Sequence, residues 1–179
     1  MGVSTAWLLV SAFAVQTTTA ATPPAPPPPA CTAPEHRQFD FWVGTWDVYR
    51  TGTDRLVGHS LIERLYAGCV IRENWLPLNG QGGSSLNTYR PEDPGWRQLW
   101  ADSSNSWAEF RGGLVDGAMV ISGVWRGAAG PGSTPLIRIR YSRGEDGSVR
   151  QEGHASTDNG VTWTPSFDFT YRPRSQPLP

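Results

Sequence analysis

The side chains best suited to chemistry lie in the middle of the chain, where polar and aromatic residues alternate with arginines. Arg72, Arg90 and Arg97 belong on the solvent face of their strands, so residues in the opposite phase share the inner face. These inner residues are Glu73, Trp75, Asn87, Tyr89, Gln98 and Trp100. Because buried polar groups need partners, the set predicts either a polar and aromatic ligand pocket or a closed hydrogen-bond network that sets strand register.

For the pocket we expect an open volume of at least ~300 Å³, the low end for ligand sites. The rings offer stacking walls and the amides offer donors and acceptors, so the ligand would be small, flat and partly polar. Glu73 is the one group of the set able to act as a base or bind a cation. A raised pKa for an unpaired Glu73 would favour an enzyme, whereas a pair with an arginine would favour a structural role.

The register of one hairpin follows from the turn between its strands. Residues 90–95 hold two prolines and form a turn, so Tyr89 pairs with Trp96. This pairing places Asn87 beside Gln98 on the same face.

Other catalytic and metal-binding arrangements find little support. A tight turn after residue 66 places Glu63 opposite Arg72, which predicts a salt bridge and not a catalytic carboxylate pair. His36, His59 and His154 lack metal-ligand spacing, and the chain has no lysine and no Gly-x-Ser-x-Gly motif. We therefore expect no metal and no cofactor, and we assign no catalytic residue.

The first residues resemble an export signal. Residues 1–21 hold a short apolar run followed by small residues, which is typical of a secretory signal peptide and too short to span a membrane. Residues 22–34 form a proline-rich linker, and residues 35–175 form a single β-barrel domain. This organisation predicts a periplasmic or secreted protein. In such a compartment Cys31 and Cys69, the only cysteines, are expected to form a disulfide.

The elements that must position these side chains are strands. Turn residues separate ten candidate strands at 45–50, 56–66, 69–76, 84–90, 96–102, 107–115, 118–125, 136–142, 148–156 and 161–172. A short apolar turn at 39–43 precedes them. The pattern predicts an all-β, up-and-down antiparallel barrel. Residues 156–163 match an Asp-box, which we interpret as a turn in which Asp158 binds backbone amides.

Several segments resemble a family of exported bacterial proteins of unknown function, thought to have a calycin-like fold. The resemblance spans about residues 36–173, and its motifs are Phe39–Val48, Gly68–Trp75, Ser85–Tyr89, Trp96–Asp102, Thr162–Trp163 and Phe167–Asp168. It implies a lipocalin-like barrel and no known activity. The chain departs from the family at Gly153 and His154, where an aromatic and an acidic residue are expected.

The triplet Gly44-Thr45-Trp46 is similar to the Gly-x-Trp entry of lipocalins, in which the tryptophan packs under an arginine of a late strand. The resemblance implies that Arg172 stacks on Trp46 at one barrel end. The same start resembles that of nitrobindin-like barrels, which implies haem binding as an alternative function, although strand phase predicts that His154 faces outward.

The formal net charge of −1 gives no attraction to nucleic acid or anionic lipid. We expect an exported barrel that binds a small molecule or has a structural role in the envelope. The alternative from another class is a cofactor-free isomerase or cyclase that uses Glu73 as its base.

Overall fold

The computed structural model describes residues 1–2 and 31–178. The expected signal peptide and most of the expected linker lie outside these residues. Residues 31–178 contain three short 3₁₀ turns: η1 (Pro34–Arg37), η2 (Asp40–Trp42) and η3 (Tyr66–Gly68). No helix within the described residues has the length and apolar character needed to cross a membrane.

The described chain forms ten strands, close to the predicted ones. They are β1 (Gly44–Arg50), β2 (Leu56–Leu65), β3 (Val70–Pro77), β4 (Gly83–Arg90), β5 (Gly95–Asp102), β6 (Trp107–Val115), β7 (Ala118–Val124), β8 (Leu136–Arg143), β9 (Val149–Ser156) and β10 (Thr164–Pro173). The last strand begins three residues later than predicted. Asp158 accepts the backbone amide of Thr162 at 2.8 Å, which holds the residues before β10 in a turn.

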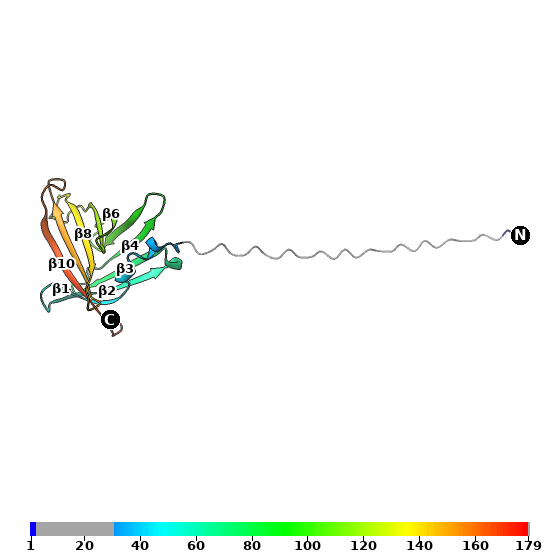
Figure 1. Ribbon diagram of the computed structural model, residues 1–179, viewed down its shortest axis with the longest axis horizontal. Helices are drawn as coiled ribbons and strands as arrows, with labels where there is room; N and C mark the ends of the chain where they lie inside the picture. Colours follow the sequence, from blue (N-terminus) through cyan, green and yellow to red (C-terminus); the bar gives the residue numbers. More distant parts are fainter. Residues whose placement is uncertain (3–30, 179) are drawn as a thin grey trace.

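Each strand pairs antiparallel with its neighbours in sequence, and β1 pairs with β10 to close the barrel (Figure 1). The predicted up-and-down barrel is therefore confirmed. Tight turns have the backbone that their residues favour: Asp116 and Gly117, between β6 and β7, have φ of 48° and 75°. The Asn87–Gln98 and Glu63–Arg72 cross-strand pairs are also confirmed, although the turn between β2 and β3 is the longer η3.

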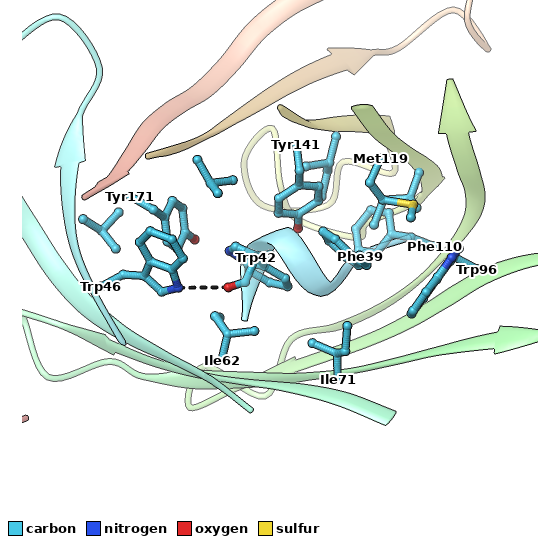
Figure 2. Close-up of a cluster of buried hydrophobic side chains, with 14 of the residues drawn as sticks. Phe39, Trp42, Trp46, Ile62, Ile71, Trp96, Phe110, Met119, Tyr141 and Tyr171 are labelled. Atoms are coloured by element: carbon cyan, nitrogen blue, oxygen red, sulfur yellow. Dashed lines mark hydrogen bonds between the residues drawn. The ribbon is translucent and has the colours of Figure 1, made fainter. Parts of the chain in front are cut away.

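One end of the barrel is filled by a plug, defined here as η1, η2 and the residues between them. Phe39 stacks on Trp42 at a centroid distance of 4.9 Å, and Trp42 contacts Tyr141 at 4.8 Å. Trp46 at the start of β1 donates its Nε1 hydrogen to the Trp42 carbonyl at 2.9 Å. Figure 2 shows Phe39 and Trp42 at the centre of this cluster, with side chains of the surrounding strands packed around them. The plug therefore fills this end of the barrel with packed hydrophobic side chains.

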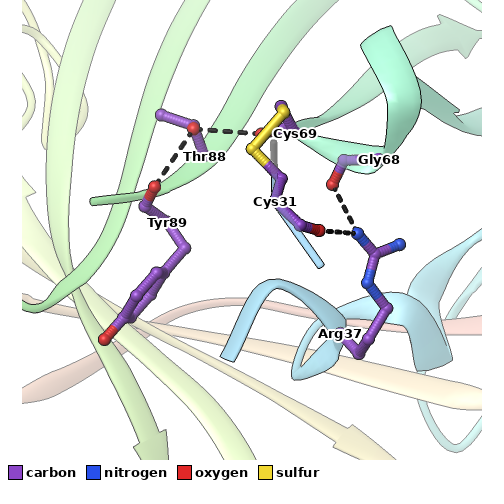
Figure 3. The surroundings of a disulfide bond; sticks show 6 residues. All are labelled: Cys31, Arg37, Gly68, Cys69, Thr88 and Tyr89. Atoms are coloured by element: carbon purple, nitrogen blue, oxygen red, sulfur yellow. Dashed lines mark hydrogen bonds between the residues drawn. A yellow bond between two sulfur atoms is a disulfide. The ribbon is translucent and has the colours of Figure 1, made fainter. Parts of the chain in front are cut away.

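The predicted disulfide is confirmed and fastens the plug to the barrel wall (Figure 3). Cys31 and Cys69 have Cα atoms 5.1 Å apart. Arg37 donates to the carbonyls of Cys31 at 2.8 Å and Gly68 at 2.9 Å. Thr88 on β4 donates to the Cys69 carbonyl at 3.0 Å. The disulfide and Arg37 thus hold the start of the plug to the β2–β3 turn, and Thr88 joins that turn to β4.

The prediction that Arg172 stacks on Trp46 is wrong. Tyr171 occupies the inner face of β10, so Arg172 points outward, where its guanidinium carbon lies 4.3 Å from the centroid of the Tyr49 ring. In the β1–β10 register Arg172 pairs with Asp47, whereas Trp46 pairs with the next residue, Pro173. Trp46 is buried, as predicted, but it is covered from inside the barrel by Trp42 and Tyr171.

Candidate functional site

Beyond the plug, the barrel interior holds a cavity of about 240 Å³ that is partly open to solvent. Side chains from six strands and the residue after β7 line it: Glu73, Trp75, Gln98, Trp100, Phe110, Trp125, Ile139, Tyr141, Gln151, Phe167, Phe169 and Tyr171. The volume is below the expected ~300 Å³, so the cavity suits a ligand smaller than a drug-sized molecule.

Four of the six predicted residues line this cavity: Glu73, Trp75, Gln98 and Trp100. Asn87 is buried behind them and accepts a hydrogen bond from Gln98 Nε2 at 2.7 Å. Tyr89 does not line the cavity. It lies beside the β4–β5 turn at the plugged end, where its ring is 5.3 Å from His36 and 6.3 Å from Trp96. Strand phase places a residue on the inner face, but it does not give the residue's height along the barrel.

Eight of the twelve lining residues were not predicted from the sequence. They come from β6, β8, β9, β10 and the residue after β7, namely Phe110, Trp125, Ile139, Tyr141, Gln151, Phe167, Phe169 and Tyr171. A signal for some of them was available. Alternation of apolar and arginine residues along 136–141, and of aromatic and polar residues along 167–171, assigns these side chains to the inner face.

Three aromatic walls of the cavity lie over glycines of the neighbouring strand. A Cβ atom added at Gly83 would lie 2.6 Å from the Trp100 ring, and one at Gly58 would lie 2.9 Å from the Trp75 ring. A Cβ atom at Gly153 would overlap the ring of Phe167. The absence of a side chain at Gly153 therefore has a structural role, since it makes room for a cavity wall.

Glu73 is the only ionisable acid or base among the lining residues other than the tyrosines. It is 4% exposed, and its carboxylate accepts hydrogen bonds from Ser60 at 3.1 Å and Ser85 at 3.3 Å. No arginine or histidine lines the cavity beside it. Burial raises the pKa of Glu73 to about 7, although the hydrogen bonds from Ser60, Ser85 and Tyr171 oppose this shift.

Hydrogen bonds join the polar groups into one ring that crosses the barrel. The ring runs through Glu73, Ser85, Asn87, Gln98, Tyr141, Gln151 and Tyr171 and returns to Glu73. The structure thus combines a hydrogen-bond network with an open volume that lies against it and is smaller than expected.

The arginines and histidines lie outside the cavity lining. Arg72 forms its predicted salt bridge with Glu63 on the outer face of β2 and β3. His59 bonds Asp47 at 2.7 Å, and His154 lies on the outer face with Arg138 and Arg140. Within the described residues no group of three His, Cys, Asp or Glu side chains could hold a metal ion. The cavity lining is therefore aromatic with one carboxyl group, and it contains no arginine or histidine.

Comparison with known proteins adds no assignment to this geometry: no family model matches the chain, and no curated protein matches its sequence.

Proposed function

We propose that the protein is an exported carrier or receptor that binds a small, planar, largely apolar molecule inside the barrel. The observation that carries this proposal is the cavity of about 240 Å³ inside the barrel, whose walls are mainly aromatic and whose polar groups belong to the hydrogen-bond ring that includes Glu73. Concave apolar sites with a few convergent polar groups are the usual form of small-molecule sites. The Cys31–Cys69 disulfide supports an oxidising compartment.

We also propose that the chain belongs with the exported, calycin-like family that its motifs resemble. The closed barrel, the short turn before β1 and the buried Trp46 support this kinship. The outward position of Arg172 counts against a strict lipocalin pattern.

Calorimetric titration with naphthalene and with indole tests the binding function. We expect saturable binding with one molecule per barrel. Ile139→Phe adds a ring at a buried lining position and should abolish binding. Leu99→Phe adds the same ring on the outer face of β5, where Leu99 is 45% exposed, and should leave binding unchanged. Absence of binding, or equal binding by both variants, would support a structural role in the envelope instead.

A second candidate function is acid–base catalysis by Glu73, as in a cofactor-free isomerase or cyclase. It is favoured by a buried carboxyl with no arginine partner and a pKa of about 7, which is suited to proton transfer at neutral pH. An enzyme would lose turnover on Glu73→Gln, whereas a carrier would only change its affinity. Haem binding finds no support in the described residues, because no histidine lines the cavity.

A further inference from the structure

The hydrogen atoms of the network can be assigned, and they define what the cavity offers to a ligand. Asn87 Nδ2 donates to the carbonyl of Ile71 at 3.0 Å, which fixes the orientation of the Asn87 amide. Its Oδ1 therefore faces Gln98, and the contact of 2.7 Å requires Gln98 Nε2 as the donor. The second hydrogen of that Nε2 is directed at the Tyr141 hydroxyl at 3.4 Å.

A second donor reaches Tyr141 from the opposite side. Gln151 Nε2 lies 2.9 Å from the Tyr141 hydroxyl, so this oxygen accepts two hydrogen bonds. The hydroxyl also carries its own hydrogen, and within the described residues no acceptor is found for it. Because Tyr141 lines the cavity, this unused donor is available to a bound molecule.

The state of Tyr141 depends on Glu73 through two intermediate groups. The Tyr171 hydroxyl lies 2.9 Å from Gln151 Oε1 and 3.3 Å from Glu73 Oε1, but it has one hydrogen. If that hydrogen is used in the shorter contact, the longer contact needs a proton carried by Glu73. A neutral Glu73 therefore donates to Tyr171, Tyr171 to Gln151 and Gln151 to Tyr141, which leaves the Tyr141 hydrogen free.

Ionisation of Glu73 reverses this order. The carboxylate then accepts a hydrogen bond from the Tyr171 hydroxyl. Within the described residues the Gln151 amide bonds only the two tyrosines, so it can turn and donate from its Nε2 to Tyr171. Its Oε1 then accepts the Tyr141 hydrogen, and the cavity loses its donor. The titratable groups that face Glu73 are Tyr171 from β10 and Tyr141 from β8, while β2 and β4 present the neutral Ser60 and Ser85. Burial raises the pKa of both tyrosines, so Glu73 alone changes charge near neutral pH.

We propose that the ligand of this cavity is a neutral planar molecule with a hydrogen-bond acceptor, such as a carbonyl or ring nitrogen, held by the Tyr141 hydroxyl, and that it binds together with a proton on Glu73. The proposal rests on the proposed binding function and narrows its ligand class.

Three probes of nearly equal shape test the proposal by calorimetric titration. Acetophenone has the acceptor, α-methylstyrene replaces the carbonyl oxygen with a methylene group, and 1-phenylethylamine has a cation at the same place. At pH 5.5 we expect acetophenone to bind about five- to tenfold more tightly than α-methylstyrene, the effect of one hydrogen bond. Equal affinities would overturn the proposal, and so would tightest binding by the amine, which would make Glu73 a cation site.

Two variants test the Tyr141 donor and the Glu73 proton separately. Tyr141→Phe should remove the preference for acetophenone and leave the α-methylstyrene affinity unchanged, whereas Tyr89→Phe, away from the cavity, should change neither. Acetophenone affinity in the wild type should fall several-fold between pH 5.5 and 8.5. In Glu73→Gln, whose amide can donate to Tyr171 at every pH, this fall should disappear. A persisting fall would contradict the coupling to Glu73.

The outcomes distinguish this inference from the function on which it rests. If naphthalene and indole bind but acetophenone binds no more tightly than α-methylstyrene, the cavity is a binding site. The proposal that its ligand carries a hydrogen-bond acceptor is then wrong. If no probe binds, the binding function itself is wrong. The isosteric comparison and its pH dependence need only the wild type, so they decide the matter even if Tyr141→Phe does not fold.

Discussion

The two halves of the barrel interior are built by the same ten strands and filled in different ways. In the plugged half, Phe39, Trp42 and Trp46 pack with aliphatic strand residues, and a disulfide fastens the entering chain. In the cavity half, rings form walls around open space and a buried carboxyl has no cationic partner. The contrast indicates that stability is concentrated at one end, which allows the other end to hold groups that are unfavourable for folding.

The largest effect that would test this contrast is the removal of the plug's central ring. Trp42 is 0% exposed, and Trp42→Ala should lower the free energy of unfolding by about 3–5 kcal/mol. Denaturant unfolding measures the loss. The matched control is Trp107→Ala on the outer end of β6, where the ring is 61% exposed and the loss should stay below about 1 kcal/mol. Similar losses would show that the plug is not the stabilising element.

Next in size is the disulfide. Joint replacement of Cys31 and Cys69 by serine opens a loop with a sequence separation of 38 and should lower the free energy of unfolding by about 3–4 kcal/mol. A reducing agent should produce a similar loss in the wild type and none in the double variant. If the cavity half held the fold by itself, the double variant would unfold at the same denaturant concentration as the wild type.

Ionisation of Glu73 should lower the free energy of unfolding as the pH rises towards neutral. Its pKa rises from 4.5 in the unfolded chain to about 7 in the fold, so the folded state holds a proton that the unfolded state releases. The resulting stabilisation is fully present below pH 4.5 and is lost as pH rises through about 7, a fall of about 3 kcal/mol. Glu73→Gln should remove this fall.

The measurement is the difference between wild type and Glu73→Gln in unfolding free energy from pH 4 to 8, because surface carboxylates contribute to both curves. Asp158, for example, has a pKa lowered to about 2 by its hydrogen bonds to Thr162, and its contribution cancels in the difference. A difference independent of pH would mean that the carboxyl is ionised throughout.

The smallest effect concerns Arg172, for which the lipocalin resemblance implied a role at the barrel end. Its side chain is 47% exposed and contacts Tyr49 and the exposed Asp54, so Arg172→Ala should cost less than about 1 kcal/mol. Arg174 is the comparison. It is 19% exposed and lies 2.6 Å from Asp47, so Arg174→Ala should cost more. A larger loss for Arg172→Ala than for Arg174→Ala would support the role at the barrel end that the lipocalin resemblance implied for Arg172.

Local patterns predicted much of the fold. Turn residues separated the strands, alternation gave their phase, and hairpin turns fixed the register of neighbouring strands, including the Asn87–Gln98 pair. The Cys31–Cys69 bond followed from there being two cysteines. These features depend on contacts that are close in sequence or have a single possible partner.

Only four of the twelve lining residues were predicted, for a physical reason. The ring of hydrogen bonds is completed by Gln98 and Tyr141, which meet across the barrel from β5 and β8. Such contacts depend on closure of the sheet and on the height of each side chain above the plug, and neither is set by alternation. Arg172 was misplaced for a similar reason, since one residue of register in the closing β1–β10 pair separates Trp46 from Asp47.

The glycines beneath the aromatic walls have a consequence for how such a barrel changes its ligand over generations. At Gly58 and Gly83 a side chain would also meet backbone atoms, so replacement there strains the sheet. At Gly153 the nearest atoms all belong to the Phe167 ring, which can move. A single codon change at Gly153 thus shifts one wall and resizes the chamber without altering the carboxyl, the amides or the plug. Selection can therefore act on ligand size at this position separately from chemical recognition and from folding.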